Sequence, residues 1–160
     1  MKITLIQADY HNEQHGKDLV MLLNAYALDP MGGGEALTEH TQQNLVATLA
    51  KRSDFLTLLC YVDGKPAGIL NCVEGFSTFK CKPLLNIHDC GVLKEYRGLG
   101  LSQKLFCEVE EISRERGYCK LTLEVLEGNT VAQNAYRKLG FTGYELDEKT
   151  GKALFWEKVL

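Results

Sequence analysis

The chain has 160 residues, 45% of them hydrophobic, with 18 basic and 21 acidic side chains that give a net charge of −3 at pH 7. This length is typical of one domain with its own apolar core, so a single domain over residues 1–160 is expected. The absence of any basic run argues against a nucleic-acid partner. No apolar stretch approaches the ~20 residues that a membrane-spanning helix needs.

Six cysteines stand at positions 60, 72, 81, 90, 107 and 119, mostly inside apolar runs and without a Cys-x-x-Cys pair. This pattern is typical of reduced core thiols in a cytoplasmic protein rather than of a disulfide framework. The four histidines are not clustered, so no metal site is expected. The N-terminal residues MKITLIQADY predict a strand rather than a signal peptide, which agrees with a cytoplasmic location.

The first part of the chain alternates between expected strands and helices. Lys2–Gln7 predicts a strand, and Gly16–Leu28 predicts a helix with one apolar face. Asp29–Gly34 ends that helix, because its three consecutive glycines form a flexible loop. Thr38 is a suitable N-cap for a second helix.

A hairpin and a further strand are expected next. Phe55–Val62 and Lys65–Val73 predict the two arms, joined by Asp63-Gly64, a favoured two-residue turn. Gly75–Pro83 is expected to be a loop. Leu84–Leu93 predicts the next strand, because it is rich in apolar and β-favouring residues.

A short glycine-containing segment, Glu95–Ser102 (EYRGLGLS), follows this strand. After it, apolar residues recur at helical spacing up to Gly117, at Leu101, Leu105, Val109 and Ile112. A loop of this kind exposes backbone N–H groups at the positive end of a helix, and glycine lets a ligand come close to them. The segment therefore predicts a binding site for the phosphate or pyrophosphate of a phosphorylated cofactor.

Two common nucleotide-binding motifs are excluded by the residues that they require. A P-loop would have Gly-Lys-Ser/Thr at its end, whereas Leu101-Ser102 follows Gly100 with no lysine before the serine. A dinucleotide-binding fingerprint would need a third glycine at the position of Gln103.

The last part of the chain predicts a strand, a helix and two closing segments. Cys119–Leu126 alternates as a strand does. Asn129 is a suitable N-cap for a helix that ends at Gly140, a typical residue just beyond a helix C-terminus. Phe141–Leu146 and Ala153–Val159 close the chain, with a polar turn between them.

Two motifs carry a resemblance to a known family. Arg97–Ser102 follows the pattern Arg-x-x-Gly-x-small and resembles the acetyl-CoA loop of the GNAT N-acetyltransferase superfamily, with Ser102 where Gly or Ala is usual. Asn129–Phe141 (NTVAQNAYRKLGF) is similar to the other GNAT signature, Asn-x-x-Ala-x-x-x-Tyr-x-x-x-Gly-Phe, and matches it throughout. The chain is identified as a member of this superfamily on Leu84–Phe141, with diamine and polyamine acetyltransferases as the nearest kind.

The resemblance implies a fold of the α/β class. The GNAT fold is a mixed, mainly antiparallel sheet with helices on both faces, and its parallel pair here would be the strands ending near Leu93 and Leu126. The implied activity moves an acetyl group from acetyl-CoA, as co-substrate, to a primary amine by direct attack through a tetrahedral intermediate. A small cationic amine is the expected acceptor. A protein or peptide N-acetyltransferase, acyl transfer to a hydroxyl or from another donor, and a catalytically silent acyl-CoA-binding module stay open as alternatives.

The resemblance and the order of strand, loop and helix indicate which residues would bind acetyl-CoA. Main-chain groups of the strand would pair with pantetheine, N–H groups of the loop would hold the pyrophosphate, and two later residues would contact pantetheine and the 3′-phosphate. In that order these residues are Cys90, Val92 and Leu93; Arg97, Gly98, Leu99, Gly100, Leu101 and Ser102; and Asn129 with Arg137, for which Lys138 is the alternative.

Tyr136 is the candidate general acid and would also contact acetyl-CoA. A phenol, with an ordinary pKa of ~10, holds its proton at neutral pH and can pass it to a leaving thiol, which resembles cysteine at ~8.5. The choice of base stays open between His88, Asp89 and a relay of positioned water without a dedicated base. His88 takes the place of a glutamate in the similar diamine acetyltransferases, whereas Asp89 would act through water or orient the amine. Strand alternation lets only one of the two face the substrate unless a bulge intervenes.

The resemblance places the acceptor groove at the first two helices and the loop that joins them. Tyr26 and Glu35 lie in this segment, and together with Asp89 they are the expected substrate-binding residues. Carboxylates there would attract a cationic amine. The implied partners are a small-molecule amine and, as in many relatives, a second copy of the chain in a homodimer.

Overall fold

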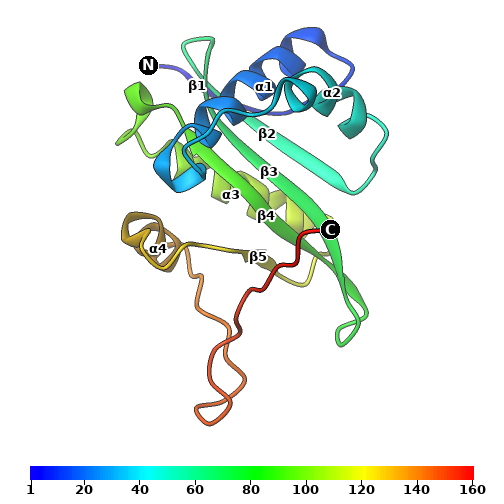
Figure 1. Ribbon diagram of the computed structural model, residues 1–160, viewed down its shortest axis with the longest axis vertical. Coiled ribbons are helices and arrows are strands. Elements are labelled where there is room, and N and C mark those ends of the chain that lie inside the picture. The colour runs from blue at the N-terminus through cyan, green and yellow to red at the C-terminus, as the bar shows by residue number, and fades with distance from the viewer. The chain divides into compact units, whose positions relative to one another are not determined.

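Five strands form one sheet in the order β1-β2-β3-β4-β5 (Figure 1). Neighbouring strands are antiparallel, except β4 and β5, which are parallel. The computed structural model describes all residues from 1 to 160. The strands are β1 (Ile3–Gln7), β2 (Phe55–Val62), β3 (Lys65–Ser77), β4 (Lys82–Val92) and β5 (Leu121–Leu123).

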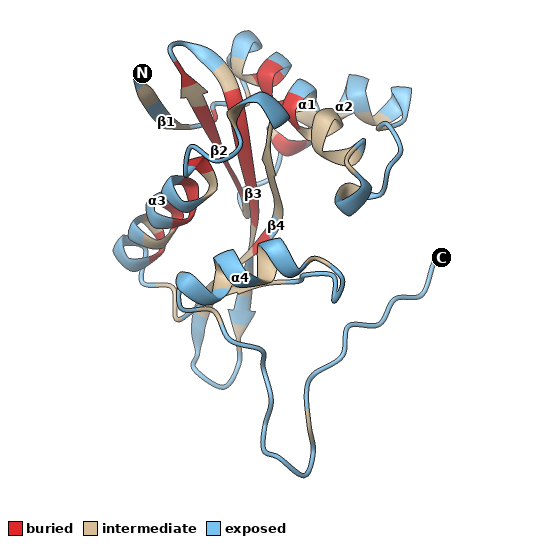
Figure 2. Ribbon diagram, turned by 90° about the vertical axis from the view of Figure 1, so that its left-hand side faces the viewer, coloured by how far each residue is buried: buried red, intermediate tan, exposed pale blue.

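Helices cover both faces of this sheet (Figure 2). On one face α1 (Glu13–Ala27) packs against β3 and β4, with α2 (Glu39–Leu49) beside it, and on the other lies α3 (Leu101–Glu115). The expected mixed, mainly antiparallel sheet with helices on both faces, and its parallel pair, are therefore confirmed.

The chain divides into two compact units. Met1–Leu123 contains the whole sheet with α1, α2 and α3, and Glu124–Leu160 contains α4 (Thr130–Lys138). The single domain over residues 1–160 stays a prediction.

The apolar core is built by alternate residues of the strands and by one stripe of each helix. On the α1 face, Leu19 and Leu22 of α1 pack with Leu59 of β2 and Ile69 of β3, all almost fully buried. On the other face Leu105 and its helical neighbours of α3 are buried in the same way. The burial pattern in Figure 2 follows from these two apolar layers, which enclose the middle strands.

Short polar residues decide where the first helices begin. Asn12 accepts hydrogen bonds from the N–H groups of Gln14 and His15, so α1 begins three residues earlier than the sequence predicted. The predicted N-cap Thr38 is confirmed, because its hydroxyl accepts from the Thr41 N–H at 3.2 Å.

The β2–β3 hairpin has the predicted turn, and the next connection is tighter than predicted. Asp63 and Gly64 both have positive φ, 48° and 79°, as a type I′ turn requires. The expected loop Gly75–Pro83 is wrong: β3 runs to Ser77, and β4 already begins at Lys82. The two strands pair as far as Ser77 and Lys82, so only four residues turn the chain.

The last part of the chain has less strand than predicted. The strand expected over Cys119–Leu126 is limited to Leu121–Leu123, because β5 pairs with only three residues of β4. The helix capped by Asn129 is confirmed, and Gly140 follows it with φ of +88°. The closing segments Phe141–Leu146 and Ala153–Val159 form no ladder, and a single bridge joins Glu145 to Lys152.

All six cysteines are free thiols, but only Cys60 and Cys72 are buried. The expectation of core thiols is wrong for Cys81 and Cys107, which are exposed, because Cys81 lies in the β3–β4 turn and Cys107 on the outer side of α3. Cys90 is half-buried, and desolvation of its thiol, followed by the nearby charge of Asp89, raises its pKa to about 12. None of the helices combines the length and the apolar character needed to cross a membrane.

These differences in exposure predict the order in which the thiols react. At about pH 8, Cys81 and Cys107 should react quickly with an aromatic disulfide reagent, because thiolate formation and access both favour exposed thiols. The measurement is the number of thiols that react before and after unfolding in guanidinium. Replacing both residues by serine should remove the fast phase, and a fast phase that survives would contradict the exposure pattern.

Candidate active site

The loop before α3 presents a row of backbone N–H groups. Gly98 and Gly100 have φ of +81° and +72°, and Gly100 is the N-cap of α3 without any side-chain cap. The first backbone N–H that bonds within this turn is that of Lys104, to the Gly100 carbonyl at 3.1 Å. The N–H groups from Gly98 to Gln103 donate to no other backbone group. They are therefore available at the positive end of a helix, as an anion site requires.

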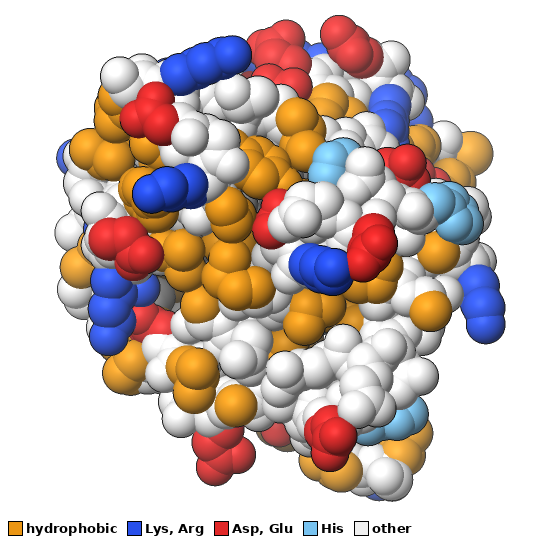
Figure 3. All heavy atoms as spheres, turned by 90° about the horizontal axis from the view of Figure 1, so that it is seen from above, with side chains coloured by type: hydrophobic (Ala, Val, Ile, Leu, Met, Phe, Trp, Pro, Cys, Tyr) orange, Lys and Arg blue, Asp and Glu red, His pale blue; other side chains and the backbone are white.

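The loop borders open space. A cavity of about 630 Å³ lies between β1 and the start of α3, lined by Ile3 and Leu5 on one side and by Leu99 and Gly100 on the other. Figure 3 shows hydrophobic side chains gathered in the middle of the face seen from above, surrounded by charged ones. No Cβ position at Gly98 or Gly100 meets another atom within 4 Å, so the approach to this backbone is unobstructed.

Beside the loop, the outer edge of β4 is open. β4 pairs with β5 only from Leu85 to Ile87, so the rest of the edge up to Val92 has no strand partner. The Leu93 N–H donates to Ala67 of β3, and N–H groups alternate between the two edges of a strand, so those of Cys90 and Val92 point outward. An extended amide chain can pair with such an edge.

The main chain of Leu93, one of the predicted contacts, is already engaged. Its N–H donates to Ala67 at 2.9 Å, and its carbonyl accepts from the Tyr96 N–H at 2.9 Å. The Val92 carbonyl accepts from Arg97 Nε at 3.1 Å. The outward groups left at this point of the edge are therefore the N–H and carbonyl groups of Cys90 and the N–H group of Val92.

A bulge in β4 decides which side chains face α1. Asp89 pairs with Asn71 of β3, but the next pair is Ile87 with Cys72, so His88 is an extra residue without a partner. The bulge that the sequence analysis left open is therefore present, and it interrupts the alternation of side chains between Ile87 and Asp89. Asp89 and Gly91 lie on the α1 face, and His88 is exposed at the bulge.

On that face, a line of polar side chains crosses the sheet from Tyr10 to Asp89. The Tyr10 hydroxyl donates to Thr57 Oγ1 at 3.1 Å, and the Thr57 hydroxyl donates to Asn71 Oδ1 at 2.6 Å. Asn71 Nδ2 then donates to Asp89 Oδ2 at 3.0 Å. We call these four residues the polar row. Asn71, Thr57 and Tyr10 were not among the residues predicted for the site, and their only signal in the sequence is the presence of Thr57 and Asn71 inside apolar runs.

Tyr26 of α1 lies directly over this part of β4. A Cβ atom at Gly91 would be 3.0 Å from Cβ of Tyr26, so a larger residue there would require Tyr26 to shift. Burial, followed by the nearby charge of Asp89, raises the pKa of the Tyr26 phenol. The structure therefore brings together two of the predicted substrate-binding residues, Tyr26 and Asp89.

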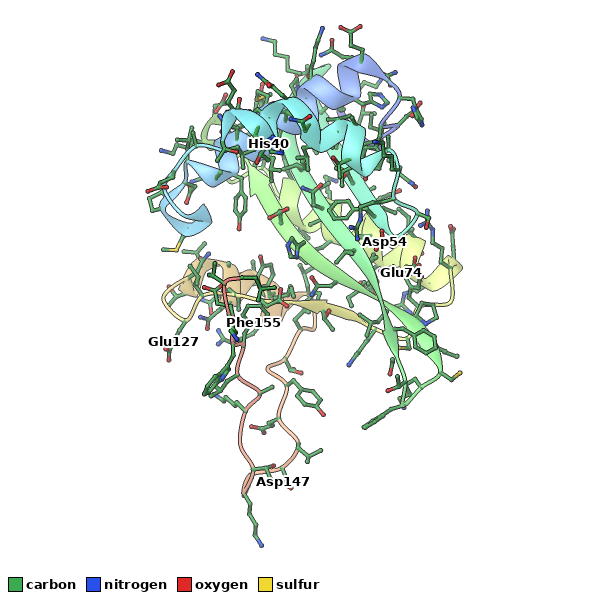
Figure 4. All side chains as sticks on the ribbon, turned by 45° about the vertical axis from the view of Figure 1, so that its right-hand side comes forward. His40, Asp54, Glu74, Glu127, Asp147 and Phe155 are labelled. Carbon is green, nitrogen blue, oxygen red and sulfur yellow. The ribbon has the colours of Figure 1, made fainter.

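The carboxylates of the α1–α2 connection have different surroundings. Asp29 Oδ1 accepts from the Met31 N–H at 2.9 Å, and Asp29 Oδ2 pairs with Arg97 at 2.8 Å. Glu35 is exposed and makes no hydrogen bond, so no hydrogen bond joins it to Tyr26 or Asp89. His40, labelled in Figure 4, is exposed on α2.

Three predicted residues lie in the second unit, on or next to α4. Asn129 Oδ1 accepts from the Ala132 N–H at 3.1 Å, so its side chain serves as the helix cap. Tyr136 is half-buried, with its ring centre 6.1 Å from that of Phe141. Arg137 donates to Asn134 and Gln133, both at 3.0 Å.

Comparison with known proteins decides the family. The model of the Acetyltransferase (GNAT) family matches residues 19–141. The chain belongs to this family. Its loop Gly98–Gln103 and the open edge of β4 both lie inside the matched region.

Curated relatives of this GNAT protein match only in part. An uncharacterized N-acetyltransferase of Methanocaldococcus jannaschii is 30% identical over 99 residues, 61% of this chain and 44% of that protein. The thialysine N-epsilon-acetyltransferase of Bos taurus is 34% identical over 84 residues, 48% of each chain. The matched part thus spans about half the length of these curated relatives.

Solved structures share the GNAT fold over nearly the whole chain. An aminoglycoside acetyltransferase from an uncultured soil metagenomic sample, meta-AAC0020 in complex with sisomicin, has a TM-score of 0.80 at 14% identity, over 99% of this chain and 96% of that one. AAC(6′)-Iy in complex with the bisubstrate analog CoA-S-monomethyl-acetylneamine has a TM-score of 0.75 at 16% identity, over 100% of both chains. At these identities the likeness shows the fold.

The ion pair of Asp29 predicts how stability depends on pH. The Met31 N–H and the Arg97 guanidinium hold the pKa of Asp29 below its ordinary value. A carboxyl group with a lowered folded-state pKa stabilises the protein above its unfolded pKa of ~3.9, and this stabilisation is lost as pH falls through the folded value. Asp29→Asn should therefore lower the urea midpoint at about pH 7, and its difference from the wild type should shrink toward about pH 3.

Glu35→Gln, in the same connection but without a partner, is the control and should leave the midpoint unchanged at both pH values. A difference for Asp29→Asn that stays constant between the two pH values would contradict the role of the ionised carboxylate.

Proposed function

We propose that this chain is an N-acetyltransferase that moves an acetyl group from acetyl-CoA to a primary amine, with a small cationic amine as the acceptor. The observation that carries the proposal is that two backbone surfaces without partners lie next to each other. One is the set of free N–H groups from Gly98 to Gln103, and the other is the open edge of β4. A diphosphate and an extended amide chain, as in coenzyme A, are the ligands that fit these two surfaces.

In this proposal, Gly98–Ser102 holds the diphosphate through backbone N–H groups, and the outward groups of Cys90 pair with pantetheine. The Val92 N–H donates to the thioester oxygen, where negative charge develops as the amine attacks. Arg97 acts through the loop, because its guanidinium binds Asp29 and the Val92 carbonyl rather than pointing away from the protein. Asn129 and Arg137 contact the remaining part of acetyl-CoA, as the GNAT signature implies.

The acceptor amine approaches Asp89 under the ring of Tyr26. A carboxylate beside an aromatic face suits an ammonium ion, since charge attraction and cation–π interaction act in the same place. No basic side chain pairs with Asp89, in contrast to Asp29. The names of the relatives, which include thialysine N-epsilon-acetyltransferase and streptothricin acetyltransferase, support an amine acceptor.

The reaction needs a neutral amine and a protonated leaving thiol. The amine nitrogen attacks the thioester carbon, the carbon–sulfur bond breaks, and Tyr136 gives its proton to the departing sulfur. The amine loses its proton to Asp89, directly or through water, or to His88, which is exposed at the bulge next to Asp89 and makes no hydrogen bond within the protein. No metal is part of the proposal.

The glycine loop gives a test of acetyl-CoA binding with a matched control. Gly100→Ala should weaken acetyl-CoA binding about tenfold, because a side chain disfavours the left-handed backbone by about 1–2 kcal/mol and shifts the N–H groups. Gly117 has the same φ of +72° just after the other end of α3, so Gly117→Ala carries the same strain away from the loop. Isothermal titration calorimetry measures both affinities, and an equal loss in the two variants would contradict the loop site.

Activity itself is tested by following thiol release from acetyl-CoA with a panel of diamines, polyamines, aminoglycosides and peptides. Tyr136→Phe should lower kcat about a hundredfold while acetyl-CoA affinity stays unchanged, because only proton transfer is lost. Tyr144→Phe, at an exposed tyrosine of the same unit, is the control. Unaltered turnover in Tyr136→Phe removes the acid assignment, and no thiol release with any acceptor favours a silent acyl-CoA-binding module.

A further inference from the structure

The polar row crosses the apolar face of the sheet in a fixed direction. Tyr10 donates to Thr57, Thr57 donates to Asn71, and Asn71 donates to Asp89. Thr57 is 0% exposed and Asn71 2% exposed, so water does not compete for their polar atoms. Three strands each contribute one member, because β2, β3 and β4 pair at Thr57, Asn71 and Asp89.

The direction of these bonds determines how the Asn71 amide is turned. A hydroxyl has a single proton, and Thr57 uses it on Asn71 Oδ1 while its oxygen accepts from Tyr10. With the amide oxygen thus engaged, the NH2 group faces Asp89. The reverse orientation would place the amide oxygen against a carboxylate oxygen, two acceptors without a proton between them.

We infer that Asn71 is a positioning residue for Asp89, and that Thr57, with Tyr10 behind it, keeps Asn71 in the required orientation. This inference rests on the proposed function, in which Asp89 contacts the amine. Asn71 holds Oδ2 of Asp89 in place, and Oδ1, which accepts no hydrogen bond from the protein, is left for the amine. The carboxylate is thereby aimed by Asn71 on the adjacent strand, and Asn71 is itself oriented by Thr57, which lies two strands away from Asp89.

The most informative variant is Thr57→Val, which keeps the shape of the side chain and replaces the hydroxyl by a methyl group. It should lower kcat/KM for the amine about tenfold, the effect of one misdirected hydrogen bond to a charged group, while acetyl-CoA affinity stays unchanged. Thr57→Ser restores the hydroxyl and should restore kcat/KM. Tyr10→Phe, at the half-buried end of the row, is a second and milder variant, with an expected loss of about threefold.

Tyr61→Phe is the matched control. Tyr61 lies on the same strand and face as Thr57, and its hydroxyl donates to the buried carboxylate of Asp18 at 2.8 Å, apart from the polar row. Its removal should lower the urea midpoint without changing kcat/KM for the amine. A loss of turnover equal to that of Thr57→Val would overturn the inference, because it would reduce the role of the row to general stability.

A double-mutant cycle shows whether Thr57 acts through Asp89. In the Asp89→Asn background, Thr57→Val should have no further effect on kcat/KM, and the urea midpoints of the four proteins should also be non-additive. Independent effects in both measurements would overturn the inference. The urea midpoints can be measured without enzymatic turnover. If the midpoints are non-additive but the protein acetylates no amine, the proposed function is rejected, while the coupling of Thr57 to Asp89 is still supported.

Discussion

One extra residue in β4 determines the arrangement of the site. His88 interrupts the pairing of β4 with β3, so Asp89 lies opposite Asn71 while Ile87 lies opposite Cys72. In an unbroken strand Asp89 would share the face of Ile87, which is covered by α3, and a carboxylate there would be buried among apolar side chains at high cost. The bulge moves it to the α1 face, where Asn71 can donate to it and Tyr26 covers it.

The surface proposed for acetyl-CoA is made of backbone, which explains the kind of sequence signal that it leaves. The loop needs glycine where φ is positive, and the strand edge needs only to remain unpaired beyond Ile87. Neither requirement names a chemically reactive side chain. The signal is therefore a spacing of glycines before an apolar helix, and the shortness of β5, which leaves the β4 edge free, has no sequence signal of its own.

Local chemistry made much of the fold predictable: Thr38 and Asn129 cap their helices, and Asp63-Gly64 turns the hairpin. Features that depend on which residues lie opposite each other on neighbouring strands were not predictable in this way. A two-residue turn alone would place Thr57 opposite Leu70, but a second bulge, beside Tyr61, brings it opposite Asn71. The polar row depends on this shift. The closing segments alternate as strands do, yet alternation does not supply a neighbour to pair with, and only the bridge from Glu145 to Lys152 forms.

Arg97 connects the three parts of the first unit that the proposed reaction needs. It belongs to the glycine loop, its Nε binds the carbonyl of Val92 at the end of β4, and its terminal nitrogen pairs with Asp29 just after α1. The ion pair with Arg97 neutralises the negative charge of Asp29. Asp89 is therefore the carboxylate near Tyr26 that has no basic side chain paired with it. A cation that enters beside Tyr26 therefore meets the carboxylate of Asp89 alone, rather than the carboxylates of both Asp89 and Asp29. The arginine of the loop thus lies between the surface proposed for the diphosphate and the surface proposed for the amine.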